Sequence, residues 1–201
     1  MPQAAVQGDD GLKAQPAGGA EPAESGLHAI RPESDVDIGI TYLWTDKGLL
    51  YLAIVLDLFN RKVVGWSLQP RMPADIVTDA LTMAWFRRKP AVGLMHHSDR
   101  GSQYVSQPFQ HQLRKSGMIY SMSRKENCWD NAPTESWFNS LKNERVHGIR
   151  YDIRVAMTAA SFEYIEVFDD RTRRHSTLGD QSPMQFLDEW RLAQHEEHLV
   201  A

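Results

Sequence analysis

The pattern of apolar and polar positions predicts three strands near the start of the folded part of the chain. Residues 36–45 alternate between apolar and polar positions, which is typical of a half-buried strand. Residues 49–58 form a near-continuous apolar run, as expected of a strand covered on both faces. A third run spans residues 62–68, and short polar turns separate the three. The pattern therefore predicts an antiparallel meander.

After this meander the apolar positions recur mainly at helical spacing. Ser182 followed by Pro183 is typical of a helix start, because serine caps the first turn and proline suits its first position. Strands and helices in this order predict an α/β layered domain with a mixed sheet. The expected helices cover residues 74–88, 105–116, 130–146, 153–168 and 185–197, and the expected short strands cover residues 93–97 and 118–122.

Residues 1–35 differ in composition from the rest of the chain. They contain no Phe, Trp or Tyr and carry six acidic and two basic residues, so the formal charge of -4 lies in this segment. Such a segment buries too little apolar surface to offset its ordering entropy. We expect a disordered acidic tail, with a docking arm as the alternative. The expected core spans residues 36–168, and a basic segment with a final helix follows at residues 169–201.

Composition excludes several classes of protein. The single cysteine, Cys128, excludes a disulfide framework and any zinc site that needs two thiolates from this chain. No apolar run reaches the ~18 residues that suggest a membrane span, and the N-terminus shows no apolar signal segment. We therefore expect a cytoplasmic protein without a membrane partner.

Two carboxylates and one cation form the candidate chemistry. Asp99 follows a short apolar strand, and Glu135 stands at the start of a predicted helix. Taken singly, each is more typical of a turn residue or of a helix terminus. Lys142 follows Glu135 by nearly two helical turns, so the two side chains share one helix face. A carboxylate that binds Mg²⁺ beside a cation that binds phosphate suits phosphoryl chemistry.

Four segments of the chain resemble one known family. They read ITYLWTDKGLLYLAIVLDLFNRKVVGWSL, HHSDRGSQY, SMSRKENCWDNAPTESWFNSLKNERVHG, and RTRRHSTLG followed by QSPMQF. The chain resembles the catalytic core of the DDE transposases of bacterial insertion sequences, of the second-reading-frame (OrfB) type, which are related to retroviral integrases. The resemblance implies a ribonuclease H-like fold, with a mixed five-stranded sheet flanked by helices. It also implies three carboxylates that hold two Mg²⁺ or Mn²⁺ ions, nicking of DNA at element ends, and attack of the freed 3′-OH on target DNA.

The resemblance assigns roles to individual positions. Asp99 matches the second Asp of the triad, Glu135 matches the Glu, and Lys142 matches a basic residue that contacts element-end DNA. The first Asp is absent, because the family's Asp-Ile-Thr-Tyr motif begins here with Gly39. We therefore expect weak metal binding and impaired catalysis. Asp37 lies on the same face of the strand and is an alternative ligand, but only through a register slip or a bulge.

The remaining candidates are open to a structural or a functional interpretation. We interpret Asp57 as structural. The basic residues are DNA-backbone contacts or a solvated face: Arg124, Lys125, Arg171, Arg173, Arg174 and His175. We expect His96 and His97 to be hydrogen-bonding neighbours of the site, and Trp129 and Trp137 to be core residues. Asp169, Asp170 and Asp180 replace residues that are usual in the family, and we expect them to weaken the hold on phosphate.

These observations favour a transposase core with an incomplete triad, so it is open whether the chain is an active enzyme. Its expected partners are element-end and target DNA, together with a second copy or an intact transposase. The acidic tail stands where family members carry an upstream helical DNA-binding region, which suggests a truncated gene copy. A non-catalytic DNA-binding or oligomerising fragment and a plain metal-dependent nuclease are the alternatives.

Overall fold

The computed structural model describes residues 31–32, 34–73, 75–90, 92–98, 101, 103–122 and 132–200. The acidic tail up to residue 30 lies outside this set, as do five residues discussed above. Those five are Asp99, Arg124, Lys125, Cys128 and Trp129.

Within the described residues, five strands form one mixed sheet in the order β3-β2-β1-β4-β5. The first three strands pair antiparallel, which confirms the predicted meander, whereas β4 pairs parallel with both β1 and β5. The predicted α/β class with a mixed sheet is therefore confirmed. The strands are β1 (Asp35–Leu43), β2 (Leu50–Asp57), β3 (Val63–Gln69), β4 (Met95–Ser98) and β5 (Ile119–Met122).

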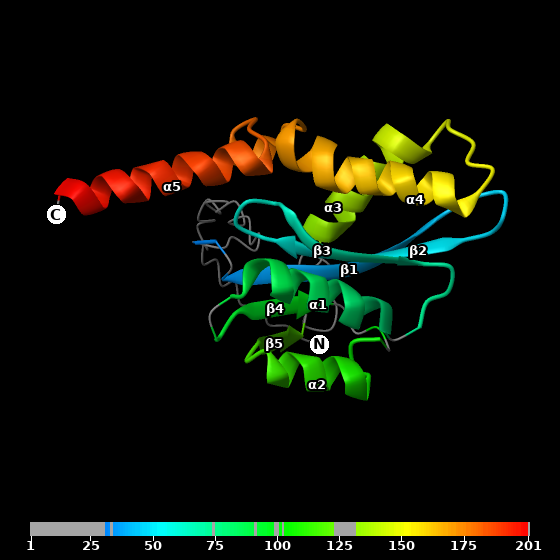
Figure 1. Ribbon diagram of the computed structural model, residues 1–201, viewed down its shortest axis with the longest axis horizontal. Helices are drawn as coiled ribbons and strands as arrows, with labels where there is room; N and C mark the ends of the chain where they lie inside the picture. Colours follow the sequence, from blue (N-terminus) through cyan, green and yellow to red (C-terminus); the bar gives the residue numbers. More distant parts are fainter. Residues whose placement is uncertain are drawn as a thin grey trace, which may run out of the picture.

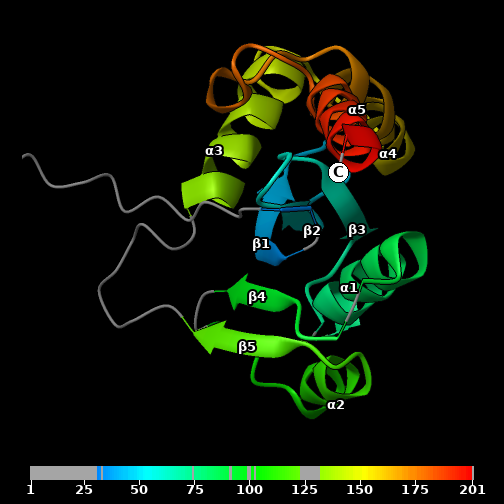
Figure 2. The ribbon, with the colours of Figure 1, turned by 90° about the vertical axis from the view of Figure 1, so that its left-hand side faces the viewer.

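Helices cover both faces of this sheet (Figures 1 and 2). The α-helices are α1 (Asp75–Arg88), α2 (Gln107–Lys115), α3 (Ala132–Leu141), α4 (Arg154–Glu163) and α5 (Pro183–Val200). Two of them continue into wider, π-helical turns, and a short 3₁₀ turn precedes α5. These turns are η2 (Lys142–Val146) after α3, η3 (Tyr164–Asp169) after α4, and η4 (Ser176–Leu178). The helix expected at residues 130–146 is thus interrupted at Lys142, where the turn widens.

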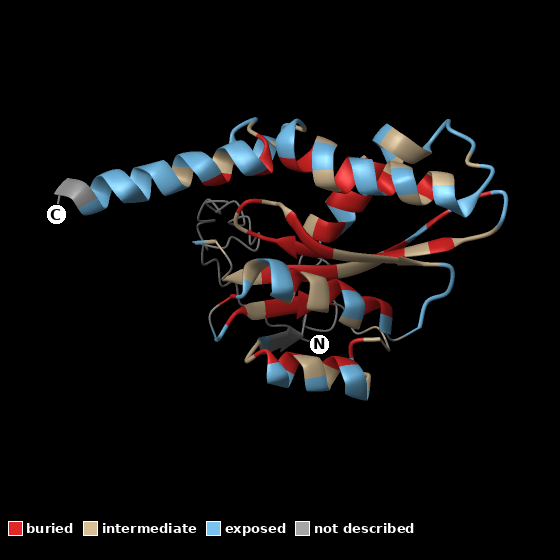
Figure 3. Cartoon of the chain, viewed as in Figure 1, coloured by how far each residue is buried: buried red, intermediate tan, exposed pale blue. Residues whose placement is uncertain are grey.

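Alternation along β2 explains why its sequence is apolar throughout. Ala53 and Val55 belong to a buried cluster on the face covered by α1 and α2. Leu52, Ile54 and Leu56 belong to a second cluster on the face covered by α3 and η3. Figure 3 shows the buried positions concentrated along the central strands and on the helix sides that face them. The central strands are therefore covered on both faces, as the apolar run predicts.

Helix α1 lies unusually close to the sheet at Gly65 in β3. A Cβ atom on Gly65 would stand 2.2 Å from the carbonyl oxygen of Ala80 and 2.6 Å from the backbone nitrogen of Ala84. Only glycine permits this approach, because the contacts are with helix backbone, which cannot rotate away. Gly65 therefore fixes α1 on the sheet.

The last helix begins as predicted and then leaves the body of the domain. The backbone N–H of Gln185 donates to Ser182 Oγ, and the backbone N–H of Ser182 donates to Gln185 Oε1, which is a capping box. Phe59 packs its ring against Phe186 and Trp190 near the start of α5. Beyond these contacts α5 extends past the sheet as an exposed helix (Figures 1 and 3). No helix within the described residues combines the length and apolarity needed to cross a membrane.

Candidate functional site

Helix α3 fills the space that a side chain at position 39 would occupy. Gly39 lies in the central strand β1, and its missing Cβ points toward α3. A Cβ there would stand 2.9 Å from both Thr134 Oγ1 and Phe138 Cε2. Real Cβ atoms do not approach other atoms this closely, so any side chain at position 39 requires α3 or these two side chains to shift. The packing of α3 on β1, as it stands, therefore requires glycine at position 39, where the resemblance leads us to expect the first Asp.

Asp37 lies on the same face of β1 and is fully buried. Its Oδ2 accepts hydrogen bonds from the Thr134 hydroxyl, at 2.8 Å, and from the Thr134 backbone N–H, at 3.2 Å. Burial raises the pKa of Asp37 to about 7, although the Thr134 hydrogen bonds and the nearby Arg61 favour the ionised form. The Asp37 carboxyl therefore holds the first turn of α3 against β1.

The strand register rules out the rearrangement by which Asp37 could replace the missing Asp. Asp37 pairs with Leu56 of β2 and with His97 of β4, and both ladders run past it without a shift. A slip or a bulge would be needed to bring Asp37 to position 39. The structure shows neither, so Asp37 stays two residues from the expected ligand position.

Glu135 and Ser98, the residue that precedes Asp99, both lie near Gly39 in the topology of the fold. Glu135 lies in the first turn of α3, next to Thr134, and its side chain is exposed. Ser98 ends β4 and pairs with Ile38, the residue before Gly39. Asp99 follows Ser98 in sequence and lies outside the described residues.

A metal site of the family's kind is not assembled by the described side chains. Hard divalent cations need several oxygen ligands, usually from more than one carboxylate. Within the part of the chain that the structure describes, no three His, Cys, Asp or Glu residues group closely enough to hold a metal ion. Position 39 offers no ligand, and Oδ2 of Asp37 is engaged by Thr134. The described residues therefore do not fit a three-carboxylate, two-metal centre.

Lys142, directly after the end of α3, extends its side chain toward β1. Its Nζ lies 4.9 Å from the centroid of the Tyr42 ring, and burial lowers the pKa of Lys142. Tyr42 belongs to the segment that begins at Gly39. The structure thus brings the predicted DNA-contacting lysine to the strand that carries the degenerate position.

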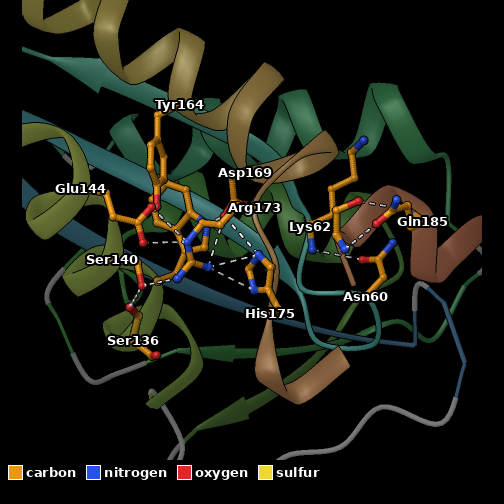
Figure 4. A network of polar contacts seen from close by, with 12 residues as sticks. Asn60, Lys62, Ser136, Ser140, Glu144, Tyr164, Asp169, Arg173, His175 and Gln185 are labelled. Atoms are coloured by element: carbon orange, nitrogen blue, oxygen red, sulfur yellow. Dashed lines mark hydrogen bonds and ion pairs between the residues drawn. The ribbon is translucent and has the colours of Figure 1, made fainter. Parts of the chain in front are cut away.

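The C-terminal basic residues divide into an inward and an outward set. Arg173 donates from Nε to Glu144, at 2.9 Å, and from Nη2 to Ser140 Oγ, at 2.8 Å (Figure 4). His175 Nε2 lies 3.2 Å from Asp169 Oδ1. Arg171 and Arg174, in contrast, have exposed side chains. Arg173 therefore ties the C-terminal segment to α3 and η2, and His175 contacts Asp169 at the end of η3, whereas Arg171 and Arg174 are exposed.

The expectation that Asp169 and Asp170 weaken a DNA-facing surface is wrong. Both side chains are buried. Asp169 Oδ2 accepts a hydrogen bond of 2.9 Å from Trp137 Nε1, and Asp170 forms an ion pair with Lys62. Their charges are compensated inside the protein, so they anchor the C-terminal segment and do not face DNA. Asp180 is exposed.

The expected structural role of Asp57 and the expected core position of Trp137 are confirmed, whereas the expected hydrogen-bonding roles of His96 and His97 stay predictions. Asp57 is buried and accepts a hydrogen bond of 2.9 Å from the backbone N–H of Phe59, which is a structural role in a turn. Trp137 is a core residue. His96 is buried against the Phe109 ring, and burial, with a smaller effect of His97, lowers its pKa to about 3. His96 is thus a neutral core residue beside the site.

The sequence pattern missed two groups that position the site. Thr134 is the partner of Asp37, and no pattern in the sequence singled it out. Glu144 joins Arg173 to the hydroxyl of Tyr164, at 2.9 Å (Figure 4). Contacts between segments this far apart leave no local pattern. For Thr134, the available signal was a polar residue on the buried side of α3.

Comparison with known families identifies the class of protein. Two family models, both described as "Integrase core domain", match residues 31–128 and 135–189. The chain therefore belongs to the integrase core family.

The curated relatives of the chain come from bacterial insertion elements. Transposase InsF for insertion sequence IS3A of Escherichia coli (strain K12) is 48% identical over 163 residues, which are 81% of this chain and 57% of that protein. The insertion element IS600 uncharacterized 31 kDa protein of Shigella sonnei is 42% identical over 151 residues, 75% of this chain and 56% of that protein. The chain thus spans little more than half the length of these curated relatives.

Solved structures share the fold. The magnesium-bound HTLV-2 integrase catalytic core domain, in its dimeric form, aligns with a TM-score of 0.57 at 15% identity, over 78% of this chain and 97% of that one. A chain of the simian T-cell lymphotropic virus intasome in complex with PP2A regulatory subunit B56 gamma aligns with a TM-score of 0.64 at 16% identity. The alignment covers 80% of this chain and 56% of that one. The fold is therefore that of retroviral integrase cores, which the expectation of a ribonuclease H-like fold anticipated.

Proposed function

We propose that this chain is a DNA-binding transposase core whose metal-dependent strand cleavage and strand transfer are impaired. The observation that carries the proposal is Gly39, because α3 occupies the space where the family's first Asp would project. Asp99 and Glu135 remain as carboxylates that would hold Mg²⁺ or Mn²⁺. Two ligands neutralise two divalent ions poorly, so metal binding is weakened.

The proposed DNA contacts follow from exposure and charge. Lys142 is placed beside β1, where its amine can meet a backbone phosphate. Arg171 and Arg174 are exposed and add to this surface. Arg124 and Lys125 keep the same proposed role, although they lie outside the described residues. Arg173 contributes by holding the C-terminal segment against η2, and His175 contributes by its contact with Asp169 within that segment.

The proposed domain division follows the packing. Residues 36–168 form the core, and residues 169–201 form a C-terminal segment that is fixed to it through Asp169, Asp170 and Arg173. The acidic segment expected at residues 1–35 is proposed as a separate tail only up to residue 34, because Asp35 begins β1 and pairs with Met95. The proposed partners are element-end DNA, target DNA, and a second copy of the chain or an intact transposase.

A second candidate function is a DNA-binding or oligomerising fragment without catalysis. Gly39 favours it, because its packing against Thr134 and Phe138 leaves no room for a ligand without rearrangement. A plain nuclease is the third possibility, and it differs from a transposase core by cutting DNA without joining it.

Nicking of supercoiled plasmid in the presence of Mn²⁺ separates these functions and needs no knowledge of the element ends. We expect the native chain to bind plasmid and to leave it supercoiled. We expect Gly39→Asp to restore some nicking, and Phe138→Leu in the same chain to increase it by relieving the contact with Cε2.

Two controls define the result. In Gly39→Asn the new side chain has the same shape as the aspartate of Gly39→Asp but is a poor metal ligand. This variant should therefore stay inactive. Asp99→Ala added to Gly39→Asp should abolish the restored nicking. Native nicking that survives Asp99→Ala would contradict the proposed site, and nicking without any joined product would favour the plain nuclease.

A further inference from the structure

A cavity of about 290 Å³ lies beside the strand that carries Gly39. Its wall combines the end of β1, the start of β2, the segment after β3 and the segment that follows Asp99. The side chains that matter are Tyr42, Tyr51, Met72, Gln103 and Tyr104. The volume is close to the lower limit of small-molecule sites, roughly 300 Å³. The cavity is therefore large enough for a single aromatic ring.

The wall has the chemistry that recognises an aromatic ring. Tyr42 and Tyr51 are cross-strand partners in the β1–β2 ladder, so both rings stand at one end of the sheet. Tyr42 exposes 52% of its surface, which leaves much of its ring accessible. Met72 adds a polarisable sulfur, which contacts aromatic rings favourably. Tyr104 is held in place because its hydroxyl donates to the carbonyl of Ile38 at 3.1 Å.

Polar groups at the cavity indicate what kind of ring it takes. The Gln103 carboxamide provides a donor and an acceptor, as needed to pair with the edge of a nucleobase. The Lys142 amine lies 4.9 Å from the centroid of the Tyr42 ring, so a cation contacts one of the residues that form the cavity wall. One unpaired nucleotide offers both a flat base and an adjoining phosphate. A purely apolar or uncharged ligand would provide no anionic group for the Lys142 amine.

We propose that this cavity binds one unpaired nucleobase of a DNA strand, with its phosphate at Lys142. The proposal rests on the proposed function, since it assumes that DNA reaches this edge of the sheet. Stacking on an aromatic side chain is largely independent of base identity, so the site would hold an unpaired base of any sequence. Its role is to keep a frayed strand end beside position 39.

Fluorescence anisotropy with three labelled DNA probes tests the proposal on the full chain. The probes are a blunt duplex, the same duplex with a three-nucleotide 3′ overhang, and that overhang made abasic. The native chain should bind the overhang roughly 10- to 100-fold more tightly than the blunt duplex, which is the range of one stacked base. The abasic overhang keeps its phosphates, and with them the proposed contact to Lys142, but it should lose the part of this preference that comes from stacking of the base.

Variants assign the preference to the cavity. Tyr42→Ala should abolish the preference for the overhang and leave blunt-duplex affinity within about twofold. Tyr42→Phe keeps the ring and should keep the preference. Phe86→Ala removes another exposed aromatic, on α1 and outside the cavity wall, and should also keep it.

The outcomes separate the two claims. If the native chain binds none of the probes, the proposed DNA function fails and this site fails with it. If it binds all three probes equally, the DNA function stands and the base site is refuted. Equal weakening of all probes by Tyr42→Ala, or an undiminished preference in that variant, would also overturn the site.

Discussion

Replacing Asp37 by Asn should stabilise the protein, and more strongly at alkaline than at acidic pH. The side chain is fully buried, and its pKa is raised to about 7 from an ordinary value of 3.8. Between these values the folded state binds more protons than the unfolded chain, so stability falls as pH rises through this window. Asparagine is nearly isosteric, stays uncharged, and can still accept from Thr134.

The magnitude follows from the pKa. A tenfold change in proton affinity corresponds to about 1.4 kcal/mol, so ionised Asp37 lowers the free energy of unfolding by roughly 4 kcal/mol above pH 7. At pH 5 the penalty is only roughly 1.5 kcal/mol. The stabilisation by Asp37→Asn should therefore be larger at pH 8 than at pH 5 by roughly 2.5 kcal/mol.

Urea unfolding followed by tryptophan fluorescence at pH 5 and pH 8 measures this difference. Asp152→Asn is the matched control, since Asp152 is exposed and its replacement should change stability little at either pH. An Asp37→Asn variant that is less stable than the native chain at pH 8, or whose effect is independent of pH, would refute the reasoning. Either result would mean that an ionised Asp37 is well stabilised in the folded protein.

Three further predictions concern packing and charge. Gly65→Ala should destabilise the protein by about 3 kcal/mol or more, seen as a lower thermal midpoint, because its Cβ would collide with the α1 backbone. Asp169→Ala should lower the free energy of unfolding in urea by roughly 3 kcal/mol, since it leaves the Trp137 Nε1–H without its acceptor and removes the carboxylate that His175 and Arg173 contact. Asp180→Ala, at an exposed site, should have little effect. Arg174→Ala should reduce the salt dependence of DNA binding by about one unit of slope without affecting stability, and Arg173→Ala should instead destabilise the fold. A stable Arg173→Ala protein would show that the inward network is dispensable.

Local patterns were sufficient to predict the architecture. The apolar run of β2 and the polar turns beside it predicted a central strand within a meander, and the pairing confirms this. Ser182 and Pro183 predicted the start of α5 through the chemistry of helix caps. These features depend on neighbours in sequence, so they can be recognised without a structure.

The site depends on contacts between distant segments, and these could not be predicted. The link from Asp37 to Thr134 spans 97 positions, and it arises only because α3 crosses β1 at Gly39. Asp169 and Asp170 were expected to repel DNA, because sequence does not show which side of a helix is covered. In the structure both are buried, Asp169 against Trp137 and Asp170 against Lys62, so they stabilise the fold and do not repel DNA.

The central claim is that this transposase core lacks the first metal-binding carboxylate because residue 39 is glycine. Titration of Mn²⁺ followed by electron paramagnetic resonance tests it directly, in the native chain and in the Gly39→Asp and Gly39→Asn variants. The account predicts weak binding by the native chain and by Gly39→Asn, and binding at least tenfold tighter by Gly39→Asp. Tight binding of two Mn²⁺ ions by the native chain, unchanged in Gly39→Asp, would contradict it.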